Sequence, residues 1–171
     1  TNPIFPLGGS EFVISARFSL PYSLWNGIDY ANLGELEKYQ DDDGNPDPAK
    51  IEQEKFRWLE FYKVKFKGSW YTRLFDKLVL RTHTEFGFLG AFNNDRGVIP
   101  FDRFFLGGDG MSQYAMDGRE TISLRGYPNQ SLSTQDGSTI YNRFSLELRY
   151  PITLKPAASI FGLTFLETGL G

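Results

Sequence analysis

Residues 62–67 read Tyr-Lys-Val-Lys-Phe-Lys, so that large apolar side chains alternate strictly with lysines. Successive side chains of a β-strand point to opposite faces, whereas the faces of a helix repeat every 3.6 residues. The stretch therefore predicts a strand with one oily face and one charged face. The same period of two returns in further stretches that begin near Ser10, Leu78, Tyr141 and Ala157.

These stretches predict an all-β chain with five strands. We place the strands at residues 10–20, 59–71, 78–90, 141–150 and 157–169. Strands of this length suit a tilted membrane crossing, which takes about 9–11 residues. In the fifth strand both faces are partly apolar, so its orientation stays open.

Two architectures compete for such strands, a soluble antiparallel sandwich and a transmembrane antiparallel β-barrel. Three lysines on one strand face suit the wet lumen of a barrel better than a packed core. The connections also alternate between long loops, at 21–58 and 91–140, and short turns, at 71–77 and 151–156. Membrane barrels have short periplasmic turns and longer external loops, so the barrel is favoured.

The connection lengths also give an orientation. The order of long and short connections predicts that residues 1–10 and 151–156 lie on the periplasmic side and both long loops outside. Five strands cannot close a membrane barrel, and an open strand edge in lipid is costly. We therefore expect the chain to form part of a larger barrel, without a signal peptide at its start.

The composition excludes several classes of function. With 18 Lys and Arg against 21 Asp and Glu, the net charge of -3 argues against nucleic-acid binding. The chain has no cysteine and one histidine, His83, so disulfides and thiolate metal sites are excluded and imidazole sites disfavoured. No serine has a His–Asp partnership to activate it. We predict no cofactor, no metal and no enzymatic activity.

Two polar groups have alternative interpretations. Residues 41–47, Asp-Asp-Asp-Gly-Asn-Pro-Asp, resemble a calcium loop, for which Glu52 or Glu54 would supply the later carboxylate. We favour a solvated acidic turn. His83, with Arg81 and Glu85, is interpreted as charge pairing in the lumen.

The loop at 91–140 is unusually long and too rich in aromatic residues to extend freely into water. It contains Phe104-Phe105-Leu106-Gly107-Gly108 and, further on, Leu124-Arg125-Gly126-Tyr127. Aromatic side chains at this density predict that the loop packs against something. The barrel lumen is the available place.

The second of these segments resembles the [VI]RG[FY] signature of the Omp85 superfamily of outer-membrane proteins. The first resembles the aromatic-x-x-Gly-Gly element that precedes the signature. The strands at 144–148 and 165–169 resemble the two wall strands that follow it. The order and spacing of the four elements carry the resemblance, which covers residues 100–171 directly.

The resemblance implies a sixteen-stranded barrel in which these are strands nine to thirteen and the motif lies on a lumen-folded sixth loop. It implies that Arg125 contacts wall carboxylates, at Glu147 and Glu167. Gly126 is expected to permit a tight backbone course that a side chain would block. Tyr127 is expected to pack on the wall. The chain departs from the family pattern in its long spacer, 109–120, and in having Leu124 for Val or Ile.

The resemblance further implies a BamA-type insertase of a Bacteroidetes-like branch, located in the outer membrane as a multi-pass barrel. Its partners would be outer-membrane lipids, unfolded outer-membrane proteins as substrates, and accessory lipoproteins of an assembly complex. An Omp85 secretion translocator, of two-partner or TamA type, is the alternative. A passive pore is a third class, for which a constriction loop without the Arg-Gly-Tyr tip is expected.

Overall fold

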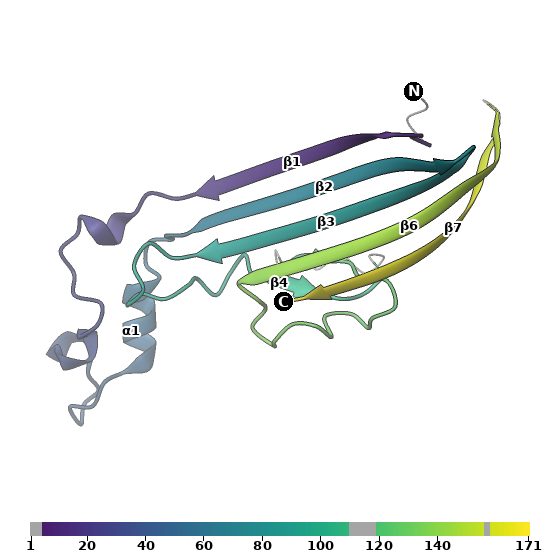
Figure 1. The fold of residues 1–171 in the computed structure, drawn as a ribbon. Coiled ribbons are helices and arrows are strands. Elements are labelled where there is room, and N and C mark those ends of the chain that lie inside the picture. The colour runs from purple at the N-terminus through teal and green to yellow at the C-terminus, as the bar shows by residue number, and fades with distance from the viewer. Residues whose placement is uncertain (1–4, 110–118, 156–157) are drawn as a thin grey trace.

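A computed structural model of the protein describes residues 5–109, 119–155 and 158–171. Its main feature is a curved, five-stranded antiparallel sheet in the order β1-β2-β3-β6-β7 (Figure 1). The strands are β1 (Gly9–Phe18), β2 (Tyr62–Phe75), β3 (Leu78–Gly90), β6 (Ile140–Lys155) and β7 (Ala158–Leu170). The five strands expected from the alternation are all present, and the all-β fold class is confirmed.

One face of the sheet exposes apolar side chains along its whole length. Ile14 in β1 is 73% exposed and Leu166 in β7 is 68% exposed. The following residues also contribute exposed side chains: Phe12, Phe18, Val64, Phe86, Phe144, Leu148 and Ile160. A soluble sandwich would bury such a face, whereas a sheet in a bilayer presents it to lipid. The sandwich alternative is therefore wrong.

The polar face carries the charged residues and is partly covered. Cross-strand neighbours on this face pair Lys67 with Glu85 and Arg81 with Glu147. In β7, Glu167 lies on this face because it contacts Arg143 of β6, at 3.0 Å between Nη2 and Oε1. This contact settles the orientation of the fifth strand, with Leu166 on the apolar face.

The two short connections differ from the predicted turns. β2 and β3 run to the tip of their hairpin, so that Asp76 and Lys77 alone join them in place of a turn at 71–77. Residues 151–155, predicted as a turn, continue β6 past a register shift between Pro151 and Thr153. Proline lacks the N–H that a regular ladder needs but is tolerated at such an irregularity. Pro156 lies outside the described residues.

The first long loop, residues 19–61, contains short helices that the sequence analysis did not predict. They are η1 (Tyr22–Leu24), η2 (Leu33–Glu35), η3 (Glu37–Tyr39) and α1 (Pro48–Lys55). Asp47 caps α1 by accepting hydrogen bonds from the backbone N–H groups of Ala49 and Lys50. Pro48 stands at the first helical position, where its missing N–H costs nothing. Tyr30, Leu33 and Tyr39 form a small apolar core within this loop.

The second long loop, residues 91–139, is the motif loop. It lies along β6 and β7 rather than extending away from the sheet (Figure 1). Within it β4 (Phe104–Leu106) and β5 (Glu120–Ile122) pair in parallel. Both long loops connect to the strands at the same end of the sheet, opposite the β2–β3 hairpin (Figure 1). No helix in the described part of the chain is long and apolar enough to cross a membrane.

The main apolar core lies between the motif loop and the polar face of the sheet. Tyr141 of β6 and Phe104 of β4 are fully buried, with ring centroids 4.6 Å apart. Gly87 of β3 leaves the room that the Tyr141 ring occupies, since a Cβ there would overlap the ring. The remaining members of the cluster are Phe61, Leu89, Ile99, Leu106 and Ile122. The motif loop therefore packs on the polar face of the sheet, which we call the wall, through a buried apolar core.

Candidate functional site

Backbone hydrogen bonds within the motif loop fix the conformation of the motif, residues 124–127. Leu124 N–H donates to the Gly108 carbonyl at 2.9 Å, and Gly108 N–H donates to the Tyr127 carbonyl at 3.0 Å. Leu124 is fully buried beside Gly169 of β7. These contacts place Arg125 at a turn that faces the ends of Glu147 and Glu167.

Arg125 bridges the two wall carboxylates. Its Nε donates to Glu167 Oε1 at 3.0 Å, and its Nη2 donates to Glu147 Oε1 at 2.6 Å and to Glu167 Oε1 at 2.5 Å. Its backbone N–H donates to Glu167 Oε2 at 2.9 Å. The guanidinium also lies over the Phe165 ring, 3.8 Å from the centroid. Loop tip and wall are thus joined by charge-assisted hydrogen bonds, about twice as strong as neutral ones.

The two carboxylates are themselves held by further arginines of the wall. Arg149 donates to Glu147 Oε2 through Nε at 2.9 Å and Nη2 at 2.7 Å. Arg81 lies 3.2 Å from the same oxygen. Glu167 is held in the same way by Arg143, at 3.0 Å. Both carboxylates are buried, and the arginines of the sheet help to orient them. The hydrogen bonds that Arg125 donates to Glu167 and Glu147 outweigh burial and raise the pKa of its guanidinium. The guanidinium therefore stays charged in this bridge, which we call the Arg125 lock.

Gly126 and Tyr127 complete the motif. Gly126 has a φ of +91°, and a Cβ built there meets no atom within 4 Å. Glycine is therefore favoured at this position by its backbone conformation, as expected, although no neighbouring atom would obstruct a Cβ. Tyr127 is 37% exposed, and its backbone carbonyl makes the contact with Gly108.

The aromatic-x-x-Gly-Gly element forms the inner edge of the loop. Phe104 and Phe105 are both buried, and Gly107 and Gly108 have φ values of +114° and +101°. A Cβ on Gly107 would collide with the backbone carbonyl of Pro128, and one on Gly108 with the Asn129 side chain. Both glycines are needed for the close approach of the two loop segments.

A family comparison bears on this arrangement. Residues 49–168, from the end of the first loop to the strand carrying Glu167, match the Omp85 superfamily domain. The chain belongs to the Omp85 superfamily. Members of this superfamily are outer-membrane proteins, which places the chain in the outer membrane at the level of the family. Comparison with curated proteins and with solved structures gives no match.

Replacing Gly107 with alanine is expected to destabilise the motif loop by about 2–3 kcal/mol, because a strained φ and a collision with backbone atoms act together. Gly126→Ala, strained but unobstructed, should cost about 1 kcal/mol. Gly162→Ala in β7, where a Cβ meets nothing, is the matched control. Amide hydrogen exchange of residues 104–108 and 120–127 measures the effect. Equal exchange in all three variants would contradict the assignment.

Two anchors of the loops were not predicted from the sequence. Lys63, predicted to face a wet lumen, is only 2% exposed and pairs with Asp102 and Glu120 of the motif loop. Its alternation with Tyr62 and Val64 gave the face correctly, but nothing in the sequence indicated its partners.

The second anchor joins the two long loops. Arg96 Nη1 lies 2.7 Å from Glu60 Oε2, and both side chains are buried. Glu60 also accepts from the N–H and hydroxyl of Ser23, at 2.8 and 2.6 Å. Arg96 further donates to the carbonyls of Lys55 and Trp58. This cluster fixes the start and end of the first loop to the motif loop.

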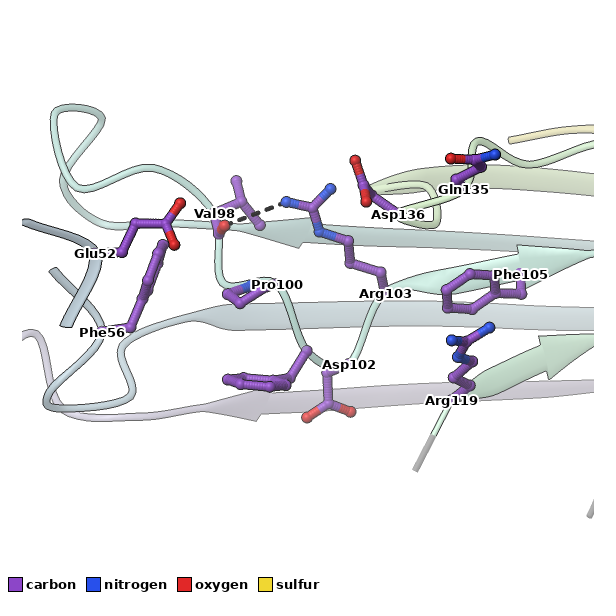
Figure 2. A pocket seen from close by; sticks show the side chains of 11 residues that line it. Glu52, Phe56, Val98, Pro100, Asp102, Arg103, Phe105, Arg119, Gln135 and Asp136 are labelled. Carbon is purple, nitrogen blue, oxygen red and sulfur yellow. Dashed lines mark hydrogen bonds between the residues drawn. The ribbon is translucent and has the colours of Figure 1, made fainter. Parts of the chain in front are cut away.

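Beside these anchors the two loops enclose a hollow of about 760 Å³. Glu52 and Phe56 line it from the first loop, and the segment 98–105 lines it from the motif loop (Figure 2). Arg103 folds back along this segment, with Nε 3.1 Å from the Ile99 carbonyl. The lining mixes aromatic rings with charges of both signs, and we assign it no ligand.

The pH dependence of the Lys63 anchor follows from Glu120. Burial alone raises the pKa of this carboxyl, but the hydrogen bonds from Lys63 and Lys65 outweigh burial and hold it below the ordinary 4.5. A depressed carboxyl pKa contributes stability that is present above the unfolded pKa and lost as pH falls through the folded one. Wild type should therefore protect residues 120–127 better than Glu120→Gln at neutral pH.

That advantage should shrink as the pH falls below 4.5, toward the lowered pKa. Protection factors of both proteins, each corrected for the intrinsic exchange rate, give the measurement. A difference that stays constant down to about pH 2 would show that Glu120 is not ionised in the anchor.

The remaining polar candidates have structural roles. Asp41 accepts hydrogen bonds from the N–H groups of Asp43 and Asn45, and Asp47 caps α1. Among the described residues no group of three or more His, Cys, Asp and Glu side chains is placed to hold a metal ion. His83 lies between Ser69 and Glu85, at 2.7 and 2.9 Å, as part of the charged wall.

Proposed function

We propose that this chain supplies the motif loop and part of the wall of a BamA-type insertase, which folds β-barrel proteins into the outer membrane. The observation that carries the proposal is the bridge from Arg125 to Glu147 and Glu167. It joins the tip of a long loop to two neighbouring strands of the wall. A loop held at its tip and packed along its length keeps this part of the wall rigid.

Rigidity of this wall matters for the proposed activity. An insertase offers an exposed strand edge to which an incoming chain adds its own strand through backbone hydrogen bonds. In a sixteen-stranded barrel such an edge opens only if the rest of the wall keeps its register. Strands β3, β6 and β7, tied together on their polar face by arginine–glutamate contacts, are suited to that supporting role.

The proposal includes the environment and the partners. The apolar face of the sheet would contact outer-membrane lipid in a multi-pass barrel, with both long loops outside the cell. Unfolded outer-membrane proteins would be the substrates, and accessory lipoproteins would complete an assembly complex. The chain would act by binding and positioning, without a cofactor and without enzymatic chemistry.

The test uses the full-length protein reconstituted in liposomes and a urea-denatured outer-membrane protein as substrate. We expect the substrate to fold at least about tenfold faster than in protein-free liposomes, as strand templating lowers the barrier. Liposomes carrying an unrelated porin-type barrel are the control. Absence of acceleration, with the barrel shown to be folded, would overturn the insertase in favour of a secretion translocator.

A further inference from the structure

Lys63 is the most deeply buried cation on the polar face of β2, and its ammonium group is fully used. Its Nζ donates to the Asp102 carbonyl at 2.5 Å and lies 3.2 Å from Asp102 Oδ1. It lies 2.7 Å from Glu120 Oε2 and 4.5 Å from the centroid of the Phe104 ring. A lysine has three N–H donors, and these acceptors take all of them.

The partners of Lys63 come from two separate segments of the motif loop. Asp102 lies at the bend that leads into β4 (Figure 2). Glu120 is the first residue of β5. The parallel pairing sets Phe104 opposite Glu120. A single wall side chain therefore ties together the two segments that form the stem of the loop.

Two neighbouring cations complete the arrangement. Lys65, two residues along the same face, lies 2.7 Å from Glu120 Oε1, so each oxygen of this carboxylate has its own lysine. Arg17 of β1 lies 3.2 Å from Asp102 Oδ1 but is largely exposed. The buried contacts converge on Lys63, which is thus the centre of the cluster.

The backbone of Asp102 gives independent support. Its φ is +61°, in the left-handed region that L residues other than Asn and Asp rarely adopt. This conformation turns the carbonyl and the carboxylate of one residue toward the same ammonium group. Such a conformation persists where the surrounding contacts determine it, and the contacts here are the buried ones of Lys63 and the exposed one of Arg17.

We propose that Lys63 is a positioning residue for the motif loop, a stem anchor without which Arg125 does not hold the tip on the wall. The anchor and the Arg125 lock share no residue, so the coupling between them acts through the loop itself. A stem fixed to β2 raises the effective concentration of the tip near Glu147 and Glu167. The proposal deepens the proposed function, and only its consequence for insertion rests on that function.

Amide hydrogen exchange of the full-length protein in lipid nanodiscs tests the anchor without any substrate. In Lys63→Met we expect residues 120–127, which include the N–H groups of Leu124 and Arg125, to exchange about tenfold faster. Exchange in β6 and β7 should stay unchanged. Lys63→Arg, which keeps the charge and can donate to both carboxylates, should restore most of the protection.

Lys67→Met is the matched control. Lys67 lies on the same face of the same strand, is more exposed than Lys63, and is 3.6 Å from Glu85 of the wall rather than from the loop. Exchange of residues 120–127 that is equal in Lys63→Met and Lys67→Met would overturn the proposal. If Lys63→Met does not fold, Glu120→Gln leaves the wall intact and is expected to give the same acceleration.

The two proposals fail in different ways. Failure of wild type to accelerate the folding of a denatured outer-membrane protein would remove the insertase but leave the exchange result standing. Normal insertion together with unchanged exchange in both Lys63→Met and Glu120→Gln would remove the anchor alone.

Discussion

Replacing Arg125 with alanine is expected to free the tip of the motif loop and to abolish most of the insertion activity. The variant loses three side-chain hydrogen bonds to Glu147 and Glu167. Each charged hydrogen bond contributes about 1.5–3 kcal/mol, but Arg143 and Arg149 still hold the two carboxylates. We therefore expect a net loss of about 3 kcal/mol, which moves the ratio of held to free tip by about a hundredfold.

Two measurements check this expectation on the same protein. The backbone N–H of residue 125 donates to Glu167 in the wild type. Its exchange rate should be higher in Arg125→Ala, because the tip is free for a larger fraction of the time. The folding rate of a denatured outer-membrane protein in liposomes should fall toward the protein-free rate. Wild-type protection of residues 124–127 in Arg125→Ala would show that the bridge does not hold the loop.

Arg125→Lys separates charge from geometry. An ammonium group keeps the positive charge but lacks the planar fork with which the guanidinium reaches two carboxylates at once. We expect this variant to lie between wild type and Arg125→Ala in both measurements. The Glu147→Ala/Glu167→Ala pair should match Arg125→Ala in insertion rate, since it removes the same bridge from the wall side.

The strands were predictable because an alternation of two residues is a local property of the sequence. Tyr62 to Lys67 required nothing beyond the identity of neighbours, and the contact partners Glu147 and Glu167 followed from a resemblance in motif order. Helix α1 was also within reach, since Asp47-Pro48 is a capping residue followed by the proline that favours a first helical turn. The run of acidic residues before Pro48 instead favoured an interpretation as a solvated loop.

The loop anchors were not predictable, because they join residues that are distant in the sequence. Lys63 meets Asp102 and Glu120 only after the loop has folded back, and no period relates these positions. The extent of β6 was missed for a different reason. Pro151 is a common turn signal, but a β-bulge accommodates it, so the strand continues.

Replacing Arg96 with methionine is expected to detach the first loop from the motif loop. Glu60 is almost fully buried, and removal of one partner leaves its charge unpaired in a place that water does not reach. Breaking a buried pair in this way costs about 3–5 kcal/mol. The Lys55 and Trp58 carbonyls lose their donor as well. The local stability of residues 22–60 should therefore fall by a similar amount.

The Ser23 N–H, which donates to Glu60, is the reporter, and its exchange rate gives the free energy of local opening. Arg57→Met is the matched control, because Arg57 is exposed, lies 4.0 Å from Glu54, and should cost less than about 0.5 kcal/mol. The double variant Arg96→Met/Glu60→Gln should recover part of the loss, since no unpaired charge stays buried. If Arg96→Met exchanges like Arg57→Met, the two loops are held together by their apolar contacts and the ion pair is dispensable.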